Sequence, residues 1–228
     1  MEHHAYTWLS GFAVYEPVAT GAFVVLLLII FSLLVKSRIG DRQRALEPED
    51  GITVRNVAEA VVEGINGLAE SVIGHHYHAY VPMLATFFVF ILVANLLGLV
   101  PGFSPPTSHF QMTFGLGLVS FFAFNVYGFK AQGGSYLKHF LGPLLLLAPL
   151  MLPIEMVSQV FRPVSLGIRL YANMFADHAV IEIFTGLTHL VVPVVFYVLG
   201  AFVCVVQAFV FTMLTAIYIS LALSHEPG

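Results

Sequence analysis

A run of 30 residues without a charged side chain, residues 194–223, most constrains what this chain can fold into. An apolar stretch of about 18 residues or more predicts a membrane-spanning helix. As one helix, this run would be about 45 Å long, while the hydrocarbon layer is about 30 Å thick. The helix must then be tilted by about 50°. The apolar stretch before it, residues 140–190, is longer still, so the two predict a hairpin of long, tilted helices.

Composition extends this interpretation to the whole chain. Of the 228 residues, 58% are apolar and only 10% are charged, whereas soluble domains carry about 25% charged residues. Further apolar stretches at residues 18–35, 80–100 and 110–129 predict three more spans. We therefore predict an all-α integral membrane protein, with one membrane domain over residues 1–228 and about five crossings.

The placement of basic residues predicts the orientation in the membrane. Six of the nine Lys and Arg residues follow the first and third spans. They are Lys36, Arg38, Arg42 and Arg44, then Lys130 and Lys138. Because basic residues collect on the cytoplasmic side, we expect the N-terminus outside and, after five crossings, the C-terminus in the cytoplasm. The first span is longer than the apolar core of a signal peptide, so we expect it to be retained.

Residues 56–73 have the pattern of an amphipathic helix. The acids Glu59, Glu63 and Glu70 recur at helical spacing, and apolar residues such as Ile65 and Leu68 fall on another face. Such a helix is expected to lie on the cytoplasmic membrane surface. A helix packed against a soluble partner would need the same residues, but we favour the membrane surface.

Arg169 is the most informative single residue, because it lies within nearly charge-free apolar sequence. A guanidinium stays protonated in proteins, and a charge at membrane depth costs from about 3 to more than 10 kcal/mol, so it marks a functional site. At 100° per residue, a narrow stripe of polar side chains lies within about 40° of Arg169 on its helix. Its members are Glu155, Ser158, Arg162, Ser165 and Asn173. Lipid cannot accept this stripe, so it must face protein or a water-filled cavity.

Other polar residues accompany the stripe. His178 and Glu182, with Asp177 beside them, lie on the back of the same helix. A histidine next to a carboxylate can shuttle protons near neutral pH; alternatively, the pair holds helices together. On the last helix Gln207 shares a face with Tyr218. Its amide could bind helices together or face Arg169.

Several other classes of site find no support in the sequence. His75, His76 and His78 resemble a metal cluster, but histidines at a membrane entry are the better interpretation, and no metal site is expected. No metalloprotease motif and no glycine-rich phosphate-binding loop occurs. We therefore expect no cofactor, no nucleic-acid partner and no nucleotide hydrolysis by this chain itself.

Four motifs closely resemble subunit a of F-type ATP synthases. They are PVSLGIRLYANMFADH at residues 163–178, QAFVFTMLTAIYIS at 207–220, LPIE at 152–155 and ANLLGLVP at 94–101. The resemblance runs from about residue 20 to residue 224. It implies a non-catalytic subunit of a proton-translocating enzyme complex in a bacterial inner membrane. The implied partners are the c-ring, b-type peripheral stalk subunits, the rest of the synthase and lipid.

The resemblance also implies roles for individual residues. Arg169 corresponds to the stator arginine, which faces the carboxylates of the rotating c-ring and prevents a leak between two proton half-channels. The outer half-channel would include Asn173, Asp177, His178, Glu182 and Gln207. The cytoplasmic half-channel would include Glu155, Ser158 and Ser165. Arg162, Asn95 and Tyr218 would support them.

One position departs from the family pattern. Members usually carry His or Glu on the last helix seven residues before the glutamine, and this chain has Gly200 there. We hypothesise that Glu182 supplies the missing carboxylate from the other helix of the hairpin. Two rival functions remain. A secondary transporter would predict internal repeats, which we do not see, and a purely structural subunit leaves the polar stripe unexplained.

Overall fold

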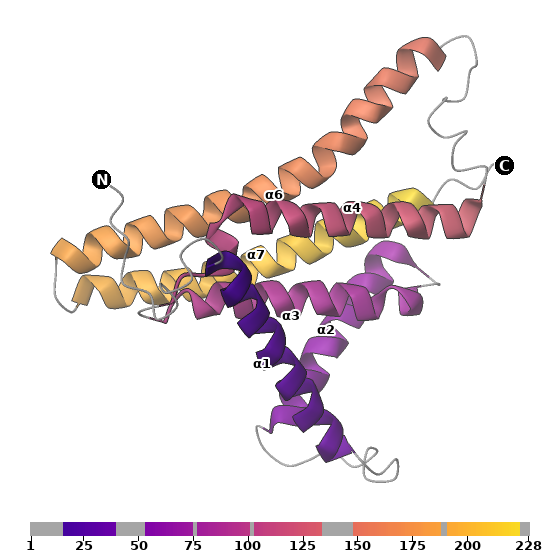
Figure 1. Cartoon of the computed structure of the whole chain (residues 1–228). Coiled ribbons are helices and arrows are strands. Elements are labelled where there is room, and N and C mark those ends of the chain that lie inside the picture. The colour runs from indigo at the N-terminus through magenta and orange to yellow at the C-terminus, as the bar shows by residue number, and fades with distance from the viewer. Residues whose placement is uncertain are drawn as a thin grey trace.

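The chain is all-helical in the residues 16–39, 53–74, 77–100, 103–133, 148–187 and 191–223 that the computed structural model describes (Figure 1). The helices, each with its bounds, are α1 (Glu16–Ile39), α2 (Val54–Ile73), η3 (Tyr77–Ala79), α3 (Val81–Leu97), η4 (Pro106–Ser108), α4 (Phe110–Gln132), α6 (Ala148–Leu187) and α7 (Val191–Leu223). The predicted all-α fold is confirmed. Every predicted helix is present, with ends moved by a few residues, although residues 140–147 and 188–190 of the predicted helix 140–190 lie outside the described residues.

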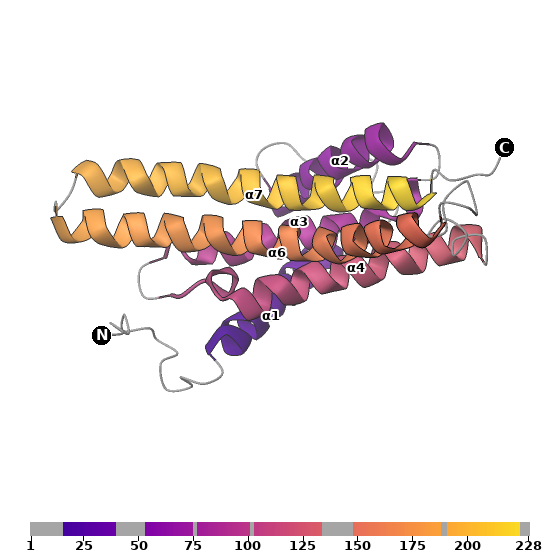
Figure 2. The same cartoon turned by 90° about the horizontal axis from the view of Figure 1, so that it is seen from above.

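Helices α6 and α7 form the predicted hairpin. The second half of α6 runs beside α7 in two perpendicular views (Figures 1 and 2), and Phe184 stacks on Phe196 between them with ring centroids 4.3 Å apart. With 40 and 33 residues, they are about 60 Å and 50 Å long. Both exceed the hydrocarbon thickness, as the sequence predicted for a tilted pair.

Three of the described helices are long and apolar enough to cross a membrane by length and composition, namely Glu16–Ser37, Phe110–Gln132 and Pro193–Leu223. Helix α3 is apolar but shorter, with 17 residues. Helix α6 is long but carries the charged stripe. The number of five crossings therefore stays a prediction.

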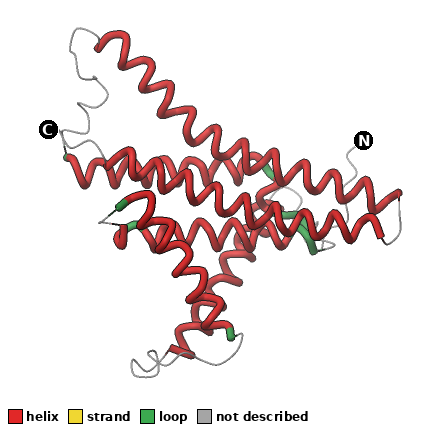
Figure 3. Tube along the Cα trace, turned by 180° about the vertical axis from the view of Figure 1, so that it is seen from behind, coloured by secondary structure: helices red, strands yellow, loops and turns green. Residues whose placement is uncertain are grey.

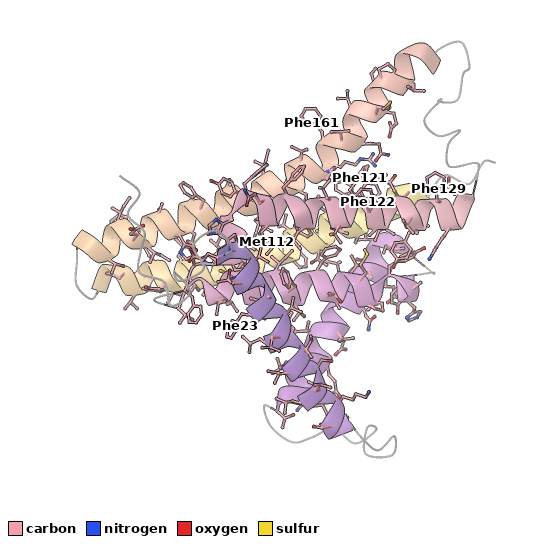
Figure 4. All side chains as sticks on the ribbon, in the orientation of Figure 1. Phe23, Met112, Phe121, Phe122, Phe129 and Phe161 are labelled. Carbon is pink, nitrogen blue, oxygen red and sulfur yellow. The ribbon has the colours of Figure 1, made fainter. Side chains whose placement is uncertain are left out.

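Helices α3, α4, α7 and the second half of α6 run alongside one another as a bundle, while α1 and α2 leave it at a steep angle (Figures 1 and 3). Helix α1 meets the bundle at Gly21, where the Met112 side chain of α4 packs against the glycine (Figure 4). Most other α1 side chains are exposed. An apolar helix exposed in this way suits a lipid environment.

Helix α6 bends at its middle, and its first half turns away from the bundle (Figure 1). Pro163 lies in the interior of α6 and faces the bundle, where it is buried. A proline ring inside a helix clashes with the carbonyl of the residue four positions earlier, here Gln159, and removes one hydrogen bond. Because the ring is on the bundle side, the clash drives the first half of the helix outward.

Two glycines set how closely α4 and α6 cross. A Cβ at Gly117 of α4 would lie 2.5 Å from the carbonyl oxygen of Pro163, and a Cβ at Gly167 of α6 would lie 3.0 Å from the Cα of Phe114. Small residues allow helix backbones in a membrane to approach this closely. This close contact therefore fixes the position of α6 relative to α4 immediately after the bend of α6.

The main core lies between α3, α6 and α7 at the same level. Helix α6 contributes Leu166, Leu170 and Met174, and these side chains pack against buried residues of the other two helices. The partners are Phe87, Ile91, Cys204, Ala208 and Phe211. This inner face determines which side chains of α6 point away from the bundle.

Helix α2 is the predicted amphipathic helix, and part of its apolar face packs on the chain itself. It begins at Thr53, whose side chain accepts a hydrogen bond from the backbone N–H of Asn56. Ile65 and Ala69 are buried in a cluster that includes residues of α3 and α7. The helix therefore packs on its own chain, an arrangement that the sequence pattern did not distinguish from contact with membrane or a soluble partner. The acids Glu59, Glu63 and Glu70 are exposed.

The last turns of α4 and α7 are joined by a side chain. Gln132 Nε2 donates hydrogen bonds to the carbonyl oxygens of Ala222, at 3.1 Å, and Leu223, at 3.4 Å. Because the final carbonyls of a helix have no partner within it, this amide completes the end of α7. The two helix ends therefore lie on the same side of the bundle.

Candidate functional site

Arg169 points away from the core, on the exposed side of α6. Leu166 and Leu170 on the inner face are buried, and α6 places the arginine about 100° around the helix from Leu170. Among the described residues, no carboxylate lies within 4.0 Å of its guanidinium. The side chain is therefore an exposed cation without a counter-ion in this part of the chain.

Apart from Asn173, the side chains exposed around Arg169 are small or apolar. The exposed neighbours on its face, Ser165, Ala172 and Ala176, are small. Farther round the helix, Ile168 and Phe175 are 46% and 56% exposed. Small side chains next to a charge allow another helix to approach its guanidinium closely.

Apolar side chains also cover the outside of both hairpin helices. On α7, Val198 and Phe202 are 67% and 66% exposed. On the first half of α6, Phe161 points outward, beyond the exposed Phe122 of α4 (Figure 4). An exposed apolar surface of this extent is suited to lipid or to a protein partner.

A hydrogen bond joins the two hairpin helices next to Arg169. Asn173 Nδ2, one turn after the arginine, donates to Gln207 Oε1 at 2.5 Å. Gln207 is buried, and Asn173 is exposed. The bond fits both interpretations of Gln207, because it joins the two helices and its donor, Asn173, lies on the Arg169 face.

A first polar cluster lies before the bend of α6 and consists of Glu155, Gln159, Arg162 and Tyr218. Arg162 Nη2 is 3.8 Å from Glu155 Oε1. Gln159 donates to Glu155 and accepts from Arg162, both at 3.4 Å. The Arg162 Cζ also lies 5.5 Å from the centre of the Tyr218 ring of α7, within the range of a cation–π interaction. Beside this cluster, Ser158 is half-buried, whereas Ser165 is exposed.

A second polar cluster lies in the second half of α6 and at the ends of its neighbours. Asp177 and His178 are half-buried there, with Asp177 directed at α7 and His178 at the end of α3. Asn95 of α3 is fully buried, and its Oδ1 accepts a hydrogen bond from Thr107 at 2.7 Å. Glu182 is exposed.

Two polar members of these clusters, Gln159 and Thr107, and one further buried polar side chain, His109, were not identified from the sequence. Gln159 is about 80° from Arg169 on the helix, outside the stripe that was considered. Thr107 and His109 follow a proline-rich loop, where sequence gives no indication of which way a side chain points. Of the three, only Gln159 could have been predicted from the sequence. It lies four residues after Glu155 and three before Arg162, a spacing at which side chains meet on a helix.

The described residues contain no group of three or more His, Cys, Asp or Glu that could hold a metal ion. Of the three histidines near the start of α3, His78 stacks on Tyr77 with ring centroids 4.0 Å apart. His75 and His76 lie outside the described residues.

Arg169 lies between the two clusters, about 10 Å along the helix from each, because Arg162 precedes it by seven residues and Asp177 follows it by eight. Two groups of titratable and amide side chains are thus separated by a fixed positive charge. Such an arrangement can pass a proton to and from an external acceptor in two separate steps. It offers no phosphate-binding loop for a nucleotide.

Comparison with known proteins gives a consistent result. The model of the family described as ATP synthase A chain matches residues 18–220. The ATP synthase subunit a of Bdellovibrio bacteriovorus is 42% identical over 213 residues, covering 93% of each chain. That of Solibacter usitatus is 43% identical over 205 residues, covering 90% of this chain and 88% of the relative. That of Trichlorobacter lovleyi is 43% identical over 191 residues, covering 84% and 82%.

Proposed function

The chain belongs to the ATP synthase A chain family, and we propose that it is the stator subunit that carries protons to and from the c-ring carboxylates through two offset half-channels. The cytoplasmic half-channel includes the first polar cluster with Ser158 and Ser165. The outer half-channel includes Asn173, Asp177, His178, Glu182 and Gln207, with Asn95 in support. Arg169 separates the two paths.

The observation that carries this proposal is the exposure of Arg169 on a surface where, Asn173 apart, the neighbouring side chains are small or apolar. Leaving a guanidinium against lipid would be costly, and no carboxylate of the described residues neutralises it. A carboxylate on another polypeptide satisfies the charge, and the small residues Ala172 and Ala176 leave room for the helix that carries it.

Coupling then follows from electrostatics. A ring carboxylate that approaches Arg169 is favoured in its ionised form, so it releases its proton into one half-channel before it reaches the arginine. After passing, it binds a proton from the other half-channel. Each proton gains about 2.3 kcal/mol per 100 mV of membrane potential. Arg169 also repels protons, which closes the direct path between the two half-channels.

The same proposal covers orientation and assembly. The Lys130 end of α4 and the end of α7 lie together, joined through Gln132, which supports one cytoplasmic side for both. The N-terminus is then outside a bacterial inner membrane. The exposed apolar surfaces of α1 and of the first half of α6 are available for lipid and for b-type stalk subunits.

Replacement of Arg169 in the assembled synthase tests the function. In inverted membrane vesicles, we expect Arg169→Ala to abolish ATP-driven proton pumping, and Arg169→Lys to reduce it strongly because the planar fork is lost. Lys130→Ala, a matched loss of an exposed cation at the end of α4, should pump normally. Normal pumping by Arg169→Ala contradicts the proposal. So does purification of the chain as a lone solute-binding oligomer without a ring.

A further inference from the structure

Among the residues that the structure describes, four buried side-chain atoms lack a hydrogen-bond partner: Asn95 Nδ2, His109 Nε2, Asp177 Oδ2 and His178 Nε2. Three of the four, on Asn95, Asp177 and His178, belong to the second polar cluster. A buried polar atom without a partner is costly, and native structures contain few of them. Their concentration in one place indicates a site that needs water or a mobile proton rather than a packing defect.

Asp177 and His178 are the two residues of α6 in this group that can bind a proton. A glycine on a neighbouring segment makes room for each of them. A Cβ at Gly200 of α7 would lie 2.7 Å from Asp177 Oδ2 and 3.3 Å from its Cγ. A Cβ at Gly98, at the end of α3, would collide with His178 Nε2. Asp177 thus occupies space on α7 that any residue larger than glycine would fill.

The groups nearest to the carboxylate of Asp177 come from α7 and from α6 itself. From α7 it meets Gly200, one turn before the fully buried Cys204. On α6 its neighbours are His178 and, farther along, Glu182. Thr107 and Asn95 complete the cluster from η4 and α3 through their own hydrogen bond. The carboxyl groups of Asp177 and Glu182 differ in placement, since Asp177 Oδ2 is buried while the Glu182 side chain is exposed.

We propose that Asp177, positioned by the absence of a side chain at Gly200, is the carboxylate of the outer half-channel that binds and releases the translocated proton. This inference rests on the proposed function, and it assigns to Asp177 the part that the sequence suggested for Glu182. The ionised carboxylate accepts a proton from water at the outer side and becomes a carboxylic acid. It then donates the same proton, past Asn173 one helical turn nearer Arg169, to the carboxylate of the ring, and is ionised again.

The proposal gives Gly200, the position that departs from the family pattern, a reason in the structure. A carboxylate at residue 177 and a side chain at residue 200 would compete for one volume. A side chain at residue 200 would therefore displace the Asp177 carboxyl group from the position that it has here. Gly200 is therefore a positioning residue and Asp177 the group that exchanges protons.

Variants of the assembled synthase in inverted vesicles test the assignment. Asp177→Asn keeps the shape of the side chain but not its proton exchange, and we expect ATP-driven pumping to fall at least about tenfold. Glu182→Gln should reduce pumping less than Asp177→Asn. Glu63→Gln, at an exposed acid of α2, should pump normally. Normal pumping by Asp177→Asn, or a larger loss in Glu182→Gln, overturns the proposal.

The role of Gly200 is tested by moving the carboxylate across the interface. Gly200→Ala should reduce pumping several-fold by displacing Asp177, whereas Gly186→Ala, where an added Cβ meets nothing within 4 Å, should not. The double variant Asp177→Ala/Gly200→Asp returns a carboxylate to the same space and should pump several-fold faster than Asp177→Ala alone. No recovery overturns the positioning role.

The outcomes separate this inference from the proposed function. Loss of pumping in Arg169→Ala together with normal pumping in Asp177→Asn rejects only the inference about Asp177. Normal pumping in Arg169→Ala rejects the proposed function itself. Equal yields of assembled complex for Asp177→Asn and Glu63→Gln establish that a loss reflects transport rather than folding.

Discussion

The crossing of α4 and α6 at Gly117 yields the sharpest prediction about stability. Replacement of Gly117 by alanine would place a Cβ 2.5 Å from the carbonyl oxygen of Pro163. A tolerable carbon–oxygen contact is about 3.3 Å, so the two helices must separate by about 0.8 Å. The position of a Cβ is set by its own backbone, and the oxygen of Pro163 also belongs to the backbone, so no side-chain rotation can relieve the contact.

The expected magnitude comes from two opposing effects. Overpacking of a well-packed interface costs about 1–3 kcal/mol, while alanine is favoured over glycine in a helix by about 1 kcal/mol. Gly115, two residues earlier in α4, has nothing within 4 Å of an added Cβ, so Gly115→Ala receives only the second effect. We therefore expect the free energy of unfolding of Gly117→Ala to be about 1–3 kcal/mol below that of Gly115→Ala.

Two measurements check this expectation. Unfolding of the detergent-solubilised chain, followed by circular dichroism, gives the difference in stability between the two variants. ATP-driven pumping gives the functional consequence, because a shift at Gly117 moves the turn that carries Arg169. A displacement approaching 1 Å can reduce a rate by up to about 100-fold. Equal stability and equal pumping of the two variants would refute the packing argument.

Three further outcomes are expected. In a double-mutant cycle of Asn173→Ala and Gln207→Ala, the coupling energy should be about 0.5–2 kcal/mol, because the two amides share one interhelical hydrogen bond. Ala176→Phe should leave the fold intact but reduce pumping strongly, since the exposed surface beside Arg169 would no longer admit a ring helix. Thr107→Val should lower the free energy of unfolding by about 1–3 kcal/mol, because the buried Asn95 Oδ1 loses its donor.

Each of these expectations has a contrary result. Additive effects in the cycle would show that the two amides act independently. Ile183→Phe, at a position that is already large and 59% exposed, is the control for Ala176→Phe, and equal pumping by both would exclude a role for the small surface. Thr107→Val as stable as the parent chain would show that Asn95 finds another partner.

The sequence predicted the helices well because long apolar runs and single periodicities are local properties. Residues 194–223 gave a long helix from their lack of charge alone, and Arg169 was identified from its surroundings in the sequence. It was harder to predict from the sequence which side chains contact each other between helices. Gln207 could equally have been a structural amide, since its contact with Asn173 depends on how α7 is rotated against α6.

The glycines were the most difficult feature to interpret. In the sequence, Gly200 indicates the loss of a side chain. Glu182 is then the predicted replacement for the missing carboxylate, because Glu182 lies one turn from His178. Only the pairing of α6 with α7 shows that Asp177 fills that space. Likewise, the apolar face of α2 was evident, but not that Ile65 would pack on the chain's own bundle.

The bend of α6 at Pro163 has a consequence for the shape of the outer surface. A helix that follows the bundle and then turns away from it is concave on its outer side (Figure 1). A straight rod touches a round cylinder along a short line, whereas a concave one follows its circumference over a longer arc. If the proposed ring lies against this side, curvature matching would keep successive ring helices close to α6 as they approach and leave Arg169.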